Sequence, residues 1–215
     1  MKCLNVAAQP LSSQTGSSPV RSFHHGNLRQ ALIDAALSAP DIERLSLRQL
    51  ASGLGVTAAA AYRHFANRED LLFEVAKIGF ALLEQRFAGA FDPSVAPSDA
   101  TEARQRLILL GQAYVQFADD MPALWRLMFG SQAEAYRNRA NFYGTRNSYE
   151  FLPAVLTGLF QQGVITAKPD EHDALFAWSA IHGAATLRSG RVPAALAPIA
   201  DLAVGVADRV IRALK

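Results

Sequence analysis

Apolar residues recur at intervals of three and four along most of the chain, a spacing that places them on one face of a helix. Leu47, Leu50 and Leu54 form one short stripe of this kind, and Leu71 and Val75 begin a longer one. No segment alternates apolar and polar residues for long enough to predict a strand. The pattern therefore predicts an all-α protein.

The predicted helices fall into two groups, which a polar, proline-bearing connector over 92–100 separates. The first group comprises three short helices between His24 and His64 and a longer fourth helix over about 68–87. The second group comprises helices at 99–119, 122–130, 133–138, 144–163, 170–189 and 197–214. We expect four regions: a disordered tail over 1–21, a helical domain over 22–70, a connecting helix over 71–91 and a second domain over 92–215.

Capping residues predict a tight turn between the second and third helices. Ser46 and Gln49 form a capping box, in which the hydroxyl accepts from a backbone N–H and the Gln side chain reaches back to the Ser46 amide. Gly55 accepts the left-handed conformation that a short turn needs, and Thr57 caps the next helix. Such an arrangement is typical of the helix-turn-helix, whose second helix enters the major groove of double-stranded DNA.

The segment over 56–72 reads VTAAAAYRHFANREDLL, in which Asn67 and Asp70 repeat the capping pattern before the fourth helix. This segment resembles the DNA-binding signature of the TetR family of bacterial transcription regulators, V-[ST]-x-x-x-x-Y-x-[HY]-F-x-x-[KR]-x-x-L. The run over 24–36 resembles the first helix of that family, with Asn27 and Gln30 as its cap.

The resemblance covers roughly residues 23–73. It implies an all-α fold with an N-terminal three-helix helix-turn-helix DNA-binding domain and a C-terminal helical domain for ligand binding and dimerisation. The function implied is sequence-specific transcription regulation, with repression relieved by a small ligand.

Four residues of the signature are expected to hold the DNA backbone. Thr57 lies at the start of the recognition helix, where free N–H groups favour a phosphate. Tyr62 and His64 offer polar groups to the backbone, and Arg68 corresponds to the basic phosphate contact of the family. Tyr62 and Phe65 have an alternative interpretation as core aromatics.

Direct reading of bases is expected from Ala58, Ala59, Arg63 and Arg48. Alanine methyl groups can pack on thymine methyl groups, and arginine can pair with guanine. Two alternatives stay open here, because Arg63 can instead hold a phosphate and Arg48 can be a solvated surface charge.

The last two predicted helices resemble a subunit interface. The helix over 170–189 is apolar on nearly every side, and the helix over 197–214 carries apolar residues at intervals of four. A helix that is apolar all round must be buried. The resemblance implies that the pair forms a four-helix bundle in a homodimer, which sets two recognition helices about 34–36 Å apart on a near-palindromic operator. A monomer core is the alternative.

The second domain holds more aromatic surface than a regular bundle needs, which predicts a pocket for an apolar ligand. The expected pocket residues are Tyr114, Phe117, Trp125, Met128, Phe129, Tyr149, Phe151, Trp178 and His182. The run from Trp178 to Gly183 resembles a Trp-x-x-x-His-Gly element of one TetR-family subgroup, and His182 is a candidate to orient the ligand. A structural histidine beside a core Trp178 is the alternative.

Composition and charge agree with a soluble cytoplasmic regulator. The net charge is only +2, from 21 basic and 19 acidic residues, so non-specific DNA affinity should be modest. The single cysteine, Cys3, fits a reducing cytoplasm. The N-terminal tail lacks the apolar core of a signal peptide, and no run is long enough to span a membrane.

The motifs of common enzyme classes are missing from the sequence. It has no Gly-rich phosphate loop, no G-x-S-x-G elbow, no H-E-x-x-H and no C-x-x-C. We therefore expect no catalytic residues and no cofactor. We also expect no metal, since His172 and His182 lie about 280° apart around a helix and cannot share one. The rival interpretations are an architectural DNA-binding dimer without an effector and a helical enzyme or cofactor-binding bundle.

Overall fold

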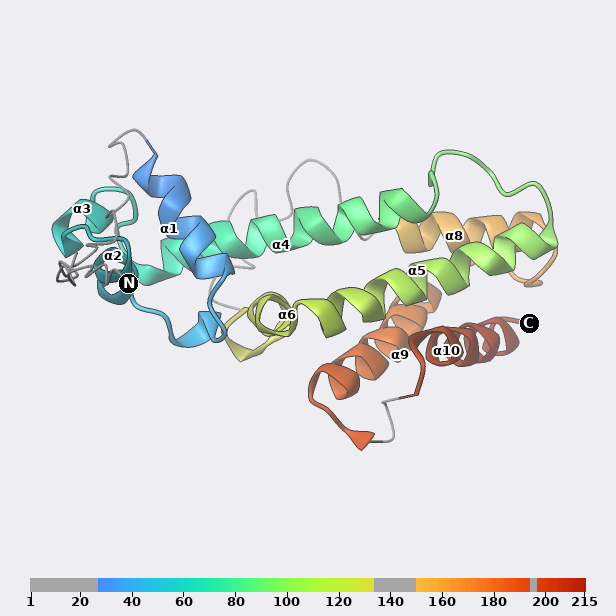
Figure 1. Ribbon diagram of the computed structural model, residues 1–215. Helices are drawn as coiled ribbons and strands as arrows, with labels where there is room; N and C mark the ends of the chain where they lie inside the picture. Colours follow the sequence, from blue (N-terminus) through green and yellow to red (C-terminus); the bar gives the residue numbers. More distant parts are fainter. Residues whose placement is uncertain (1–26, 134–149, 194–196) are drawn as a thin grey trace, which may run out of the picture.

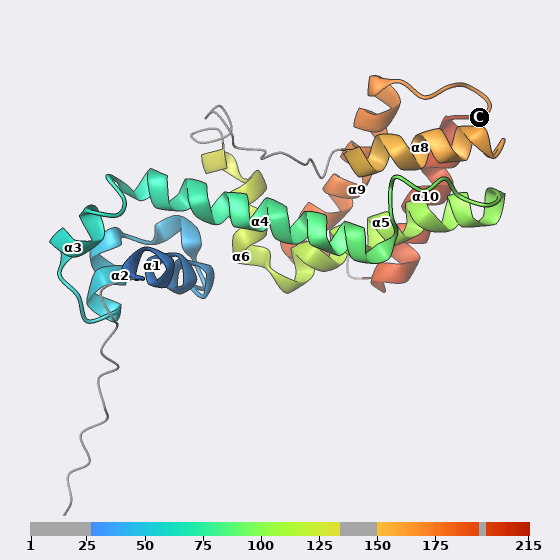
Figure 2. The same cartoon turned by 90° about the horizontal axis from the view of Figure 1, so that it is seen from above.

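The computed structural model describes residues 27–133, 150–193 and 197–215, and within these ranges the chain is helical with no strand. Figures 1 and 2 show a small N-terminal unit at one end of a long helix, and a larger helical unit around the other end. Among the described residues, no helix combines the length and apolar character that crossing a bilayer requires. The all-α prediction is confirmed.

The N-terminal unit is built from short elements around one small core. Figure 1 shows them gathered together: α1 (Leu28–Leu37), the 3-10 turn η1 (Ile42–Arg44), α2 (Leu47–Gly53) and α3 (Ala58–Tyr62). Leu32, Leu47 and Ala61 are almost completely buried at their meeting point. Small and aliphatic side chains thus bring α2 and α3 into close contact.

Helix α4 (Arg68–Ala90) runs through both units. Leu72 and Val75 in its first half are buried, and so are Leu83 and Phe87 in its second half. Gly79 in the middle allows close approach, because a Cβ there would lie 2.6 Å from Sδ of Met128 on α6. Helix α4 therefore links the two units through one continuous hydrophobic core.

The larger unit surrounds α5 (Ala100–Asp120), which contacts α4, α6, α8, α9 and α10. Its other elements are α6 (Pro122–Phe129), the turn η2 (Ser131–Ala133), α8 (Phe151–Gln161), α9 (Glu171–Ser189) and α10 (Ile199–Ala213). Figure 2 shows α8, α9 and α10 gathered around the far half of α5.

Polar side chains hold the connector before α5. The Asp99 carboxylate accepts from the amides of Thr101 and Glu102, each at 2.8 Å. Hydrogen bonds from the Ser98 backbone and hydroxyl, and then from Arg106, lower the pKa of Glu102 to about 2. The connector is thus tied to the first turn of α5 by a carboxylate that stays ionised at neutral pH.

The structure differs from the predicted elements at several points. Helix α4 continues to Ala90, three residues beyond the prediction, and α8 ends at Gln161. Asn27 precedes α1 as predicted but makes no capping bond, and Gln30 donates instead to Asp34 within the helix at 2.8 Å. Most of the predicted helix over 133–138 and the start of the one over 144–163 lie outside the described residues.

Candidate functional site

The turn between α2 and α3 is held by the hydrogen bonds that its sequence predicts. Ser46 Oγ accepts from the amide of Gln49 at 3.2 Å, and Gln49 Oε1 accepts from the amide of Ser46 at 3.2 Å. Gly55 has φ of +70°, which residues with a Cβ rarely adopt. The capping box and the glycine turn are both confirmed.

Helix α3 begins with a side-chain cap and is pressed onto α2 through alanine. Thr57 Oγ1 accepts from the amide of Ala60 at 3.2 Å, and Ala61 is completely buried. The small side chain of Ala61 lets α3 approach α2 closely, while Ala59 and Tyr62 of the same helix are exposed. Figures 1 and 2 show α2 and α3 at the end of the molecule away from α9 and α10.

The side chains predicted to meet DNA differ in exposure. Most of them are exposed, and the exposed ones are Arg48, Thr57, Ala59, Tyr62, Arg63 and His64. Tyr62 is 45% exposed, so it is not the core aromatic of the alternative interpretation, whereas Phe65 is 3% exposed and does belong to the core. Ala58 is half-buried. The structure thus exposes polar side chains at both ends of α3, with Thr57 at its start and Tyr62, Arg63 and His64 at its end.

Arg68 requires a correction, because its guanidinium is engaged within the protein. Its Nε donates to the carbonyl of Leu45 at 2.7 Å, and its Nη2 donates to the carbonyl of Glu43. Its Nη1 lies 3.6 Å from a carboxylate oxygen of Glu69. These bonds tie the start of α4 to the segment before α2. In the conformation described, Arg68 supports the turn and is not placed as a free phosphate ligand.

A largely apolar cavity of about 540 Å³ lies in the larger unit, between α4, α5, α8, α9 and α10. Its volume falls in the range of small-molecule sites. Tyr114, Phe129 and Trp178 line it, as the sequence predicted. Its remaining apolar lining includes Phe80, Leu83, Phe87, Leu107, Leu110, Leu156, Ile181 and Val206, which the sequence analysis did not assign to a pocket.

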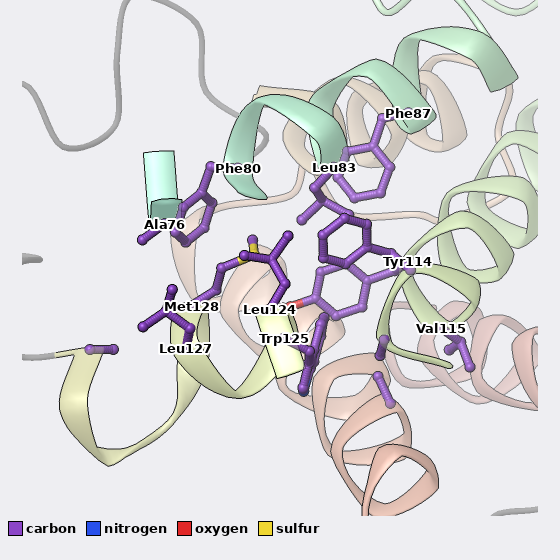
Figure 3. Packing of buried hydrophobic residues seen from close by; sticks show 14 of the residues in the cluster. Ala76, Phe80, Leu83, Phe87, Tyr114, Val115, Leu124, Trp125, Leu127 and Met128 are labelled. Atoms are coloured by element: carbon purple, nitrogen blue, oxygen red, sulfur yellow. The ribbon is translucent and has the colours of Figure 1, made fainter. Parts of the chain in front are cut away.

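Four predicted pocket residues lie behind the cavity wall and are corrected here. Phe117, Trp125 and Met128 are at most 2% exposed and Phe151 is 6% exposed, and none of the four lines the cavity. Figure 3 shows Trp125 and Met128 packed beside Tyr114 and the α4 side chains. These side chains are buried in the core and pack behind the residues that line the cavity. Tyr149 lies outside the described residues.

His182 also stands outside the lining, but it is linked to it by a hydrogen bond. Its Nδ1 lies 2.8 Å from the hydroxyl of Tyr114, and Trp178 Nε1 donates to the same hydroxyl at 2.8 Å. The His182 ring stacks on Trp125 with centroids 5.2 Å apart. The Trp-x-x-x-His spacing thus brings both side chains to one tyrosine, and His182 orients Tyr114.

Helices α9 and α10 expose large apolar side chains. On α9, Leu175 is 54% exposed, Phe176 47% and Leu187 52%, and Val204 on α10 is 39% exposed. Large exposed apolar patches are typical of contact surfaces. Within the described residues, no group of three or more His, Cys, Asp or Glu side chains is placed to hold a metal ion.

The protein has a capped helix-turn-helix at one end of the long helix α4 and a helical unit with an apolar cavity at the other end. This combination defines a class of two-part helical DNA-binding proteins. Two family models match the chain. The model for bacterial regulatory proteins of the tetR family matches residues 32–75, and the tetracyclin repressor-like C-terminal domain matches residues 107–214. The chain belongs to the TetR family.

Two curated proteins with similar sequences are a transcriptional regulator and a nucleoid occlusion factor. An HTH-type transcriptional regulator of Mycobacterium tuberculosis is 30% identical over 118 residues, which are 54% of this chain and 49% of that regulator. The match thus spans about half the length of that relative. The nucleoid occlusion factor SlmA of Marinobacter nauticus is 29% identical over 143 residues, which are 64% of this chain and 69% of SlmA.

Solved structures share the fold. A Rhodococcus protein of unknown function is 33% identical, with a TM-score of 0.68 over 90% of this chain and 98% of that one. The ketosteroid transcriptional regulator KstR2 of Mycobacterium tuberculosis is 18% identical, with a TM-score of 0.58 over 88% of this chain and 96% of that one.

We predict that Arg68→Ala lowers the free energy of unfolding by about 2 kcal/mol, because charge-assisted bonds to two backbone carbonyls are lost. The matched control is Arg63→Ala, since Arg63 is exposed and its removal should change stability by less than about 0.5 kcal/mol. Urea denaturation without DNA, at one protomer concentration, measures both. Equal stability of the two variants would contradict the supporting role of Arg68.

Proposed function

We propose that the protein is a sequence-specific transcription regulator that acts as a repressor and is released from its operator by a small, largely apolar ligand. The observation that carries the proposal is the exposure of polar side chains at both ends of α3, Thr57 at its N-terminal cap and Tyr62 and Arg63 at its C-terminal end. The proposal places the protein in the cytoplasm with the DNA. It requires no catalytic step, cofactor or metal.

The contacts with DNA divide between backbone and bases. Thr57, Tyr62 and His64 hold phosphates at the start and end of the recognition helix. Ala58, Ala59 and Arg63, together with Arg48 of the preceding helix, face base edges in the major groove. Arg68 contributes to DNA binding indirectly, because it holds the segment that leads into α2.

Two copies of the chain are needed to read a palindrome. The exposed apolar side chains of α9 and α10 supply the contact, since burying Phe176 and Leu187 of α9 and Val204 of α10 against a twofold mate removes them from water. A four-helix bundle at this surface sets the two recognition helices one DNA turn apart, about 34–36 Å. The α9–α10 pair is therefore the proposed homodimer interface.

Release by a ligand follows from the position of the cavity against α4. Phe80, Leu83 and Phe87 of α4 line the cavity, and Leu72 of the same helix lies in the core of the N-terminal unit. A ligand that favours a different placement of α4 lowers operator affinity by its differential binding energy, typically about 1–3 kcal/mol. The cavity favours this proposal over an architectural DNA-binding dimer, which has no use for one.

The operator is found by selecting bound sequences from random duplexes. On that operator, Tyr62→Phe should weaken binding by about tenfold for every sequence alike, because one hydrogen bond to a phosphate is lost. Arg48→Ala should instead relax discrimination at one base position, at a cost of about 1–3 kcal/mol. Affinities for the operator and its single-base variants measure both.

The two outcomes are distinguishable. A loss of affinity confined to particular bases in Tyr62→Phe would refute its backbone role. Uniform weakening in Arg48→Ala would make Arg48 a phosphate contact.

We predict that Phe176→Glu weakens the dimer by about 100-fold or more, because each protomer loses a buried aromatic ring and gains a charge in the interface. Sedimentation equilibrium measures the dissociation constant. Phe160→Glu is the matched control, since Phe160 is an exposed phenylalanine on α8, a helix outside the proposed interface. Equal dimer affinities in the two variants would place the interface elsewhere.

A further inference from the structure

The charged side chains in the cavity wall are of one sign. The described lining contains two carboxylates, Asp170 and Glu171, and no Lys, Arg or His. Its other polar side chains are Tyr114, Thr157 and Trp178, and the rest are apolar. A ligand therefore meets negative charge or neutral surface, and no cation of the lining can neutralise an anion.

Glu171 shares a helix face with the cavity-lining side chains of α9. Ala174, Trp178 and Ile181 follow it at helical intervals, and all of them line the cavity. The ten helical steps from Glu171 to Ile181 span about 15 Å of helix. The carboxylates thus stand at one end of this wall, while Trp178 and the Tyr114 hydroxyl that it contacts lie further along.

The two carboxylates are not equivalent. Asp170 caps α9, and its Oδ1 accepts from the amides of His172 at 2.8 Å and Asp173 at 3.1 Å. Glu171 makes no hydrogen bond or ion pair with the described residues and is exposed at the start of the helix. Its charge is therefore available to a ligand, and its side chain can be changed without breaking the cap.

Charge next to a largely apolar cavity discriminates strongly between ligands. An anion that enters loses hydration without gaining a partner, and it is repelled by both carboxylates. A positive group that stays at the end nearest Glu171 keeps contact with water and is attracted. An uncharged group experiences neither effect.

We propose that the cavity selects its ligand by charge: it takes apolar molecules that are uncharged or carry a positive group at the end nearest Glu171, and it rejects anionic amphiphiles such as fatty-acid carboxylates. The proposal rests on the proposed function, because it specifies the chemical class of the effector. Glu171 is the residue that sets the preference.

The test uses three probes with the same ten-carbon chain and different head groups: decanol, decyltrimethylammonium and decanoate. The full-length protein is loaded with the uncharged dye Nile red, and each probe is titrated near neutral pH while the dye fluorescence is followed. We expect decanol and decyltrimethylammonium to displace the dye. The affinity for decanoate should be lower than that for decanol by on the order of tenfold or more. Decanoate that binds as tightly as decanol would overturn the proposal.

Two variants assign the preference. Glu171→Lys should raise the affinity for decanoate and lower the affinity for decyltrimethylammonium, each by on the order of tenfold, and it should leave the affinity for decanol unchanged. Asp34→Lys on α1 changes the net charge equally, is exposed and lies outside the lining, so the wild-type order should persist. The same order in Glu171→Lys as in the wild type would overturn the role of Glu171.

A separate operator-binding measurement keeps this proposal distinct from the proposed function. Probes that bind in the expected order without releasing the operator would contradict the effector function and leave the charge selectivity standing. Probes that release the operator with no order among the head groups would contradict the selectivity alone. Failure of Nile red and all three probes to bind would overturn both.

Discussion

The packing of one continuous helix against both units of the protein, within a single hydrophobic core, is the constraint on which the structure depends. Helix α4 buries Leu72 and Val75 in the N-terminal unit and lines the cavity with Leu83 and Phe87. Interiors are close-packed, so a displacement of one end of such a helix is not absorbed locally. A molecule in the cavity therefore touches the same rigid element that positions the recognition helix.

Local interactions made the DNA-facing unit predictable from the sequence. The Ser46 box, the Gly55 turn and the Thr57 cap all join residues within a few positions, so their spacing is visible in the chain. The exposure of Tyr62 was also expected, because the alanines of α3 account for its buried side. The helical pattern of the larger unit followed from the same periodicity.

The features that the sequence did not predict depend on contacts between residues far apart in the chain. Arg68 matches a family phosphate contact, but its partners are carbonyls of residues 43 and 45. Aromatic residues drew attention as pocket candidates, yet Phe117 and Trp125 are used in packing, and much of the cavity wall is aliphatic. Which apolar side chains border a cavity depends on how several helices meet, and periodicity only selects the inward face.

The most direct test of the account is the distance between the two N-terminal units of the dimer, measured by pulsed electron paramagnetic resonance. Cys3 is replaced by serine, and a spin label is placed on α1 at Asp34→Cys. The account predicts one narrow distance distribution on the operator, and a shifted or broader one when an operator-releasing ligand fills the cavity. An unchanged distribution, with the ligand bound and operator affinity lost, would contradict coupling through α4.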